Sequence, residues 1–127
     1  LRRIANSLLN AVRCTDFAAR WGGDEFAVLL TDTDLSGARL FAKRLQEVNR
    51  EMAQRRGDDH QAPTTTLSMG FVIIRETYDE ISPLLKSADR ALYAAKEGGK
   101  DGARFLVLAN GDSSEDILPT PAEGTGA

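Results

Sequence analysis

The sequence RWGGDEF, residues 20–26, constrains the fold of this chain more than any other segment. Two adjacent glycines permit a tight reversal of the backbone, because neither carries a Cβ. Strand-like sequence precedes them at residues 16–21 and follows them at residues 26–30. The pattern therefore predicts a β-hairpin with its turn at residues 22–25 and two adjacent acidic side chains at its tip.

The two acids of this turn, Asp24 and Glu25, suit a divalent cation and a phosphate. Mg²⁺ takes carboxylate oxygens and usually keeps water and substrate phosphates as its other ligands. We therefore expect half of a site for a nucleotide and its metal ion. The alternative, from residues 22–25 alone, is an ordinary hairpin whose glycines serve the turn and whose acids are solvated.

The rest of the sequence predicts one domain, residues 1–108, followed by a disordered tail or linker, residues 109–127. Apolar residues recur at helical spacing in residues 1–13, 34–52 and 82–97, whereas residues 64–74 and 103–108 are strand-like. Residues 55–63 are polar and predict a loop. This order predicts an α+β fold, in which helices pack on a largely antiparallel sheet.

Several single residues predict details of these elements. Asp34 should cap the second helix, and Ser82 should cap the third, with Pro83 at its first position and a stop at residues 98–99. Gly70, inside a strand pattern, predicts a bulge or the close approach of another backbone. Trp21 and Phe26 flank the turn and should anchor the hairpin in the core.

Composition excludes several classes of protein. With 127 residues, 42% of them hydrophobic, the chain can bury one modest core, and no apolar run is long enough to span a membrane. The net charge is −3, and four of the acids lie in the tail, which has no Lys or Arg, so the rest of the chain is near neutral. A general nucleic-acid surface is therefore not expected. The single cysteine, Cys14, cannot form an internal disulfide, which fits a reducing cytoplasm. The sequence opens inside a helical pattern, which suggests a piece of a longer protein.

Two further groups of charged residues could carry chemistry. Lys86 and Arg90 lie four apart and so share one face of the third helix, where the alternative is a solvated basic surface. Arg13 and Asp16 lie just before the hairpin, and a pair of this kind also occurs often by chance.

Taken together, these three segments resemble the diguanylate cyclase (GGDEF) family. Residues 22–26 match the family signature letter for letter, and residues 84–96, LLKSADRALYAAK, are similar to its C-terminal signature. Arg13 and Asp16 match the Arg-x-x-Asp pair that the family carries at this offset before the glycines. The resemblance covers residues 1–108 and implies a nucleotide-cyclase-like fold. It also implies that the first strand of the full domain is missing here. In the family, that part supplies another metal-binding Asp and the groups that recognise guanine.

The resemblance implies roles for the hairpin residues. Gly22 and Gly23 would let the backbone approach the phosphates of GTP, and Asp24 and Glu25 would bind the metal ion, Mg²⁺ or Mn²⁺. Asp24 would be the principal catalytic carboxylate and Glu25 the supporting one.

The same resemblance implies roles for the other two groups. Lys86 and Arg90 would bind GTP phosphates, while Arg13 and Asp16 would form an inhibitory site for the product, cyclic di-GMP. Asp89 also matches the signature, but we interpret it as a structural acid.

The function implied is bacterial signalling, in which two GTP condense to cyclic di-GMP with release of pyrophosphate. Catalysis would need a homodimer, because each domain of the family holds one GTP. The parent protein would be cytoplasmic or anchored by an upstream segment, with no nucleic-acid polymer as partner and no membrane contact from these residues. These residues alone would be inactive. The alternative is a catalytically silent domain that binds cyclic di-GMP or GTP as a regulatory module.

Overall fold

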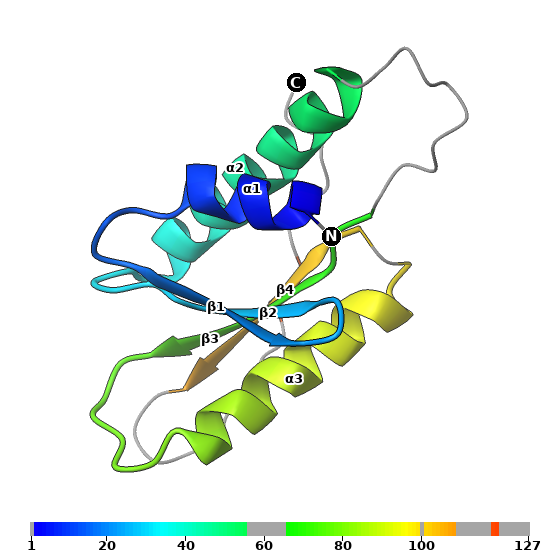
Figure 1. Cartoon of the computed structure of the whole chain (residues 1–127). Helices are drawn as coiled ribbons and strands as arrows, with labels where there is room; N and C mark the ends of the chain where they lie inside the picture. The colour runs from blue at the N-terminus through cyan, green and yellow to red at the C-terminus, as the bar shows by residue number, and fades with distance from the viewer. Residues whose placement is uncertain (1, 56–65, 100, 109–117, 120–127) are drawn as a thin grey trace. The chain divides into compact units, whose positions relative to one another are not determined.

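The computed structural model describes residues 2–55, 66–99, 101–108 and 118–119 (Figure 1). Two compact units, Leu1–Thr65 and Thr66–Ala127, each have their own helices and strands. In chain order the elements are α1 (Arg2–Ala11), β1 (Phe17–Gly22), β2 (Glu25–Leu29), α2 (Leu35–Arg55), β3 (Met69–Ile74), α3 (Ser82–Glu97), β4 (Ala103–Leu108) and β5 (Leu118–Pro119). This mixture confirms the predicted α+β class. In the described residues no helix has the length and apolar character needed to cross a membrane.

In the first unit, helices α1 and α2 pack against each other (Figure 1). The buried apolar side chains of the two helices are small or branched: Leu8, Ala11, Ala38, Ala42 and Leu45. The hydroxyl of Ser7, also buried, donates a hydrogen bond to the sulfur of Met52 at 3.3 Å. At the start of α2, Asp34 caps the helix as predicted, because its Oδ1 accepts the amide hydrogen of Gly37 at 2.8 Å.

The predicted hairpin is present, but its strands are residues 17–22 and 25–29 rather than 16–21 and 26–30, and β1 has a one-residue irregularity. Strands β1 and β2 pair antiparallel from Phe17 opposite Leu29 to Gly22 opposite Glu25. Between Arg20 and Gly22 the register shifts, so Trp21 is an extra residue in β1, which is the geometry of a β-bulge. The prediction that Trp21 and Phe26 anchor the hairpin in the core is wrong for Trp21, which is 62% exposed, whereas Phe26 is half-buried. All six residues of β1 are exposed.

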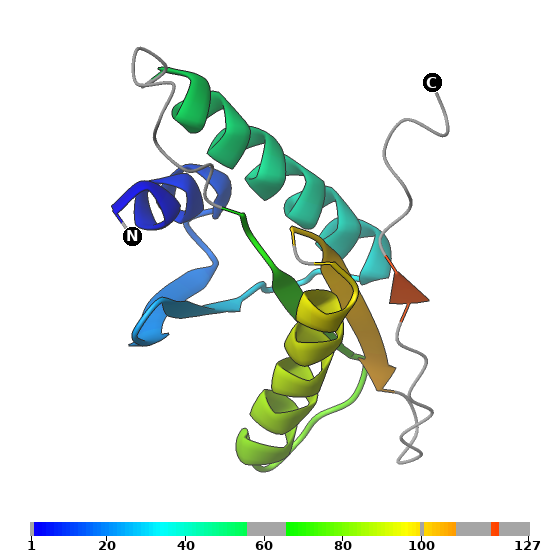
Figure 2. The ribbon, with the colours of Figure 1, turned by 90° about the vertical axis from the view of Figure 1, so that its right-hand side faces the viewer.

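In the second unit, α3 lies along strands β3 and β4, and the short β5 lies beside β4 (Figure 2). Of the three strand pairings in the described residues, β1–β2 and β4–β5 are antiparallel, and β3–β4 is parallel, with Met69 opposite Ala103. A parallel pair requires a long crossover between its strands, and α3 supplies it. Phe71 and Phe105 are directly opposite and stack with ring centroids 4.8 Å apart.

Gly70 marks the closest contact between α3 and the sheet. A Cβ built at this position would lie 2.2 Å from the backbone nitrogen of Leu92 and 2.4 Å from the backbone oxygen of Ala88. The predicted close approach of another backbone is therefore confirmed, and the approaching backbone belongs to α3. Ala91 and Ala95, which are buried on the same helix, have small side chains and so allow α3 to pack close to the sheet.

The start of α3 differs from the prediction. Ile81, not Ser82, is the N-cap, and no side chain caps the helix. Ile81 already has helical backbone angles, φ −83° and ψ −26°, and its carbonyl accepts the amide hydrogen of Leu85, which makes Ser82 the first helical residue. The predicted stop is confirmed, with Gly98 as C-cap and Gly99 at φ +112°.

Several predictions fall partly outside the described residues. Of the predicted loop at residues 55–63, Arg55 ends α2 and the rest lies outside the described residues. The predicted strand at residues 64–74 begins there too, at residues 64–65. Its residues 66–68 are described but are not part of a strand. Of the predicted tail, Leu118–Pro119 form β5 opposite Phe105 and Arg104, and the remaining residues lie outside the described part.

Candidate functional site

The tip of the hairpin is a two-residue turn formed by Gly23 and Asp24. Gly22 ends β1 and Glu25 begins β2, and these two residues are partners in the strand register. Gly23 has φ +46°, a left-handed conformation that glycine adopts readily. A Cβ at Gly22 or Gly23 would meet no heavy atom within 4 Å, so the space on the Cβ side of both glycines is open.

The two carboxylates of the tip differ in accessibility. Asp24, in the turn, is exposed, whereas Glu25, at the start of β2, is half-buried. In the described part of the chain no group of three or more His, Cys, Asp or Glu side chains could hold a metal ion. Asp24 and Glu25 offer one or two carboxylates to a cation at this tip, and its other ligands would be water and substrate phosphates. Mg²⁺ is commonly bound in this way, so the residues fit it.

Arg20 fixes the shape of the turn and was not found by sequence reasoning. Its Nε and Nη2 both donate to the carbonyl oxygen of Gly23, at 3.1 and 2.7 Å. This pair of bonds holds the peptide that precedes Asp24. The sequence feature that could have pointed to Arg20 is its position, two residues before the glycine pair and on the strand that enters the turn.

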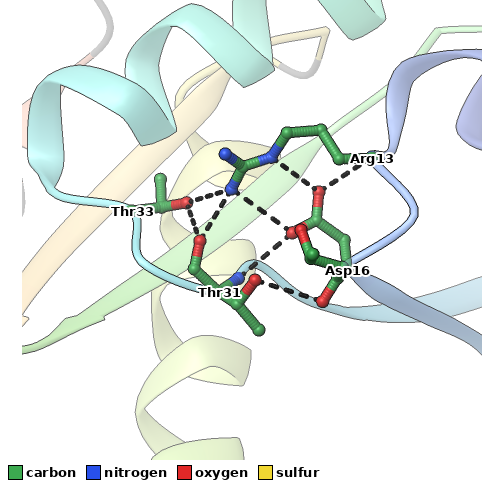
Figure 3. A network of polar contacts seen from close by, with 5 residues as sticks. Arg13, Asp16, Thr31 and Thr33 are labelled. Atoms are coloured by element: carbon green, nitrogen blue, oxygen red, sulfur yellow. Dashed lines mark hydrogen bonds and ion pairs between the residues drawn. The ribbon is translucent and has the colours of Figure 1, made fainter.

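Arg13 and Asp16 are brought together at the open end of the hairpin (Figure 3). The backbone amide of Arg13 donates to Asp16 Oδ2 at 2.9 Å, and Arg13 Nε approaches the same oxygen at 3.4 Å. The amide of Thr31, just after β2, donates to Asp16 Oδ1 at 3.1 Å. Asp16 thus ties the turn before β1 to the turn after β2.

The surroundings of the two residues differ in a way that bears on binding. The side chain of Asp16 is 2% exposed, and that of Arg13 is 56% exposed. The pKa of Asp16 is lowered, chiefly by the hydrogen bond from the Arg13 backbone amide and also by that from Thr31, although burial acts in the opposite direction. Asp16 is therefore an ionised anchor inside the turn, and Arg13 is the accessible member of the pair. Cys14, beside Arg13, is exposed.

Lys86 and Arg90 lie one turn apart on α3, and both are exposed. They belong to the second compact unit, whereas the hairpin belongs to the first. The structure thus groups the predicted residues as the hairpin tip, the Arg13 and Asp16 pair, and the basic pair on α3.

Comparison with known proteins identifies the family. The family model described as "Diguanylate cyclase, GGDEF domain" matches residues 1–102. The chain belongs to this family. The GGDEF signature itself is residues 22–26, the turn and the start of β2.

Two curated relatives of this GGDEF chain are proteins of bacteria. It is 35% identical to the probable diguanylate cyclase DgcT of Escherichia coli over 102 residues, covering 80% of this chain and 22% of DgcT. It is 32% identical to the response regulator PleD of Caulobacter vibrioides, covering 80% of this chain and 22% of PleD. The chain thus spans about a fifth of the length of these relatives.

A solved structure resembles the GGDEF chain as well. It is the crystal structure of the diguanylate cyclase SiaD in complex with its activator SiaC from Pseudomonas aeruginosa. The match has a TM-score of 0.57 at 25% identity and covers 84% of this chain and 39% of that one. This neighbour supports the cyclase-like fold.

Proposed function

We propose that this chain is the metal-binding and phosphate-binding part of a diguanylate cyclase that condenses two GTP into cyclic di-GMP and releases two pyrophosphates. The observation that carries the proposal is the open two-residue turn, which presents Asp24 beside unobstructed glycine backbone in a chain of the GGDEF family. The relatives are bacterial, so we place the activity in the bacterial cytoplasm, where GTP is made.

The reaction consists of two equivalent steps. In each, the 3′ oxygen of one GTP forms a bond to the α-phosphorus of the other, and the bond from that phosphorus to pyrophosphate breaks. We assign Asp24 as the acceptor of the hydroxyl proton and as a metal ligand, with Glu25 as a second ligand. A bound Mg²⁺ or Mn²⁺ would supply Lewis-acid activation and neutralise phosphate charge. The backbone at Gly22 and Gly23 is open to the phosphates.

We propose that the basic pair on α3 binds phosphates of GTP. Lys86 and Arg90 are exposed and one helical turn apart, so both cations can bind one chain of phosphates. Their charge offsets that of the triphosphate and of the leaving pyrophosphate. Because each GGDEF domain holds one GTP, we propose that two copies must meet for turnover.

We propose that Arg13 and Asp16 form an inhibitory site for the product. Arg13 is accessible, so its guanidinium can bind a phosphate of cyclic di-GMP. The side chain of Asp16 is buried, so we assign it mainly to holding Arg13 and the neighbouring turns in place.

A product assay tests the proposed reaction. The longest natural polypeptide that contains residues 1–127, incubated with GTP and Mg²⁺, should yield one cyclic di-GMP for every two pyrophosphates. We expect residues 1–127 alone to yield none, because the family places further metal and guanine ligands ahead of this segment. Product from residues 1–127 alone would contradict the second expectation. Absence of product from the longer polypeptide, with GTP still bound, would favour a silent binding module instead.

Arg20 offers a test of how the turn is positioned. Arg20→Met keeps the apolar stem but removes both hydrogen bonds to the Gly23 carbonyl. We expect kcat/KM to fall about tenfold, since each bond contributes about 0.5–1.5 kcal/mol. The Mg²⁺ concentration for half-maximal rate should also rise, which a merely structural role would not cause. Arg20→Lys restores one donor group, so its kcat/KM should lie between those of wild type and Arg20→Met.

The matched control is Arg44→Met, because Arg44 is an exposed arginine on α2. We expect wild-type activity from this variant. Equal kinetics for Arg20→Met and Arg44→Met would remove Arg20 from the site.

A further inference from the structure

The guanidinium of Arg13 is already engaged within its own unit (Figure 3). Its Nη2 donates to the carbonyl oxygen of Thr31 at 2.7 Å and to Thr33 Oγ1 at 3.1 Å. Its Nε and Nη2 also face the two oxygens of Asp16, at 3.4 and 3.5 Å. We call the bonds of Nη2 to Thr31 and Thr33 the latch.

We propose that the latch competes with cyclic di-GMP for Arg13, and that the Thr33 hydroxyl thereby lowers the affinity of the inhibitory site. This inference rests on the proposed function, in which Arg13 binds a phosphate of the product. It adds a residue that sets the concentration at which inhibition begins.

The geometry of the guanidinium explains the competition. A phosphate is bound most strongly by two parallel N–H groups on one edge of the planar guanidinium. The edge formed by Nε and Nη2 faces Asp16, and Nη2 also donates to the Thr31 carbonyl and to Thr33 Oγ1. A bidentate phosphate on either edge that includes Nη2 must therefore displace a bond to Asp16 or a bond of the latch. The free energy of that bond is subtracted from the free energy of binding.

Thr33 is the part of the latch that a substitution can remove cleanly. Its hydroxyl accepts from Arg13 and donates to the Thr31 carbonyl at 2.8 Å. Thr33→Val keeps the shape of the side chain and leaves the Thr31 carbonyl as an acceptor. One hydrogen bond of this kind contributes a net stabilisation that corresponds to about a two- to tenfold change in an equilibrium constant. We therefore expect Thr33→Val to bind cyclic di-GMP about two- to tenfold more tightly than wild type.

A matched control lies two residues away in the same turn. The hydroxyl of Thr31 donates to the carbonyl of Thr15 at 3.1 Å, so it is engaged away from the Arg13 guanidinium. Thr31→Val is the same chemical change and keeps the Thr31 carbonyl that the latch uses. We expect its affinity to equal that of wild type. Thr33→Ser, which keeps the hydroxyl, should also bind like wild type.

The experiment is a calorimetric titration of cyclic di-GMP into the longest natural polypeptide that contains residues 1–127, with unfolding temperatures measured for every variant. Tighter binding by Thr33→Val than by Thr31→Val supports the latch. Equal or weaker binding by Thr33→Val, while Arg13→Ala still abolishes binding, overturns the latch and leaves the inhibitory site standing. If Arg13→Ala binds like wild type, the inhibitory site itself is wrong and the latch fails with it.

Nitrogen-15 spectra of the arginine side chains provide a second measurement that does not depend on affinity. In the product-free protein, Thr33→Val should shift the Nη signals of Arg13, because Nη2 is the atom that donates to Thr33, and Thr31→Val should leave them in place. An unchanged Arg13 signal in Thr33→Val would show that Thr33 does not hold the guanidinium, and would overturn the latch.

Discussion

Replacing Asp24 by asparagine is expected to lower the rate of cyclic di-GMP formation about 10²–10⁴-fold, the range typical of a lost acid-base group. Asp24 lies in the turn itself and is exposed, so the substitution changes charge at the proposed metal end of the site without disturbing a packed core. Asparagine keeps the size of the side chain but loses the negative charge and the basic oxygen. The measurement is product formation from GTP and Mg²⁺ by the longest natural polypeptide that contains residues 1–127.

The control for this prediction is Asp79→Asn, which makes the same change at an exposed acid between β3 and α3. We expect it to keep wild-type activity. GTP binding without metal should survive in Asp24→Asn, because the proposed phosphate-binding pair, Lys86 and Arg90, is intact. An unchanged rate in Asp24→Asn would contradict the catalytic assignment.

The second large effect is expected from Gly70→Ala, which should destabilise the second unit by about 3 kcal/mol or more. Overpacking of a core typically costs about 1–3 kcal/mol, and here the added methyl meets the backbone of α3 rather than a movable side chain. Helix and strand would have to separate, which would also disrupt the packing around Phe105. Urea unfolding of the natural polypeptide, monitored by circular dichroism, measures the loss.

Gly98→Ala is the matched control for Gly70→Ala. A Cβ at Gly98 would lie 2.5 Å from Arg104 Nη2, which is the far end of a flexible side chain and can move, and 3.3 Å from the backbone oxygen of Ala94, which has to give by only a few tenths of an ångström. Gly98 has φ −78°, which any residue adopts. We expect a loss below about 1 kcal/mol. If both variants lose the same stability, the close contact at Gly70 is not the cause.

Features set by a residue and its near neighbours were predictable from the sequence. Asp34 caps α2 because its side chain reaches an amide three residues on. The two glycines at residues 98–99 end α3, and residues 103–108 form a strand with the predicted bounds. Even the close approach at Gly70 was predictable, because a strand rarely tolerates glycine without a reason. The identity of the approaching element was not.

Features set by geometry between segments were not predictable. The bulge at Trp21 adds a residue to β1 without leaving a mark in the sequence pattern. Trp21 is exposed rather than buried, as is every other residue of β1. Arg20 holds the turn through a carbonyl, which any residue could supply. Thr33 contacts Arg13 across twenty positions of sequence, and only the closure of the hairpin brings them together. At the N-terminus of α3, one more residue with helical angles moved the cap from Ser82 to Ile81.

The exposed Cys14 next to Arg13 has a practical consequence. It is the single thiol in these 127 residues. A fluorescent dye attached to its sulfur would sit one residue from the guanidinium and outside the packed helices. Movement of the arginine between its internal partners and a bound dinucleotide could then be followed in real time by emission intensity, with no cysteine introduced into this segment.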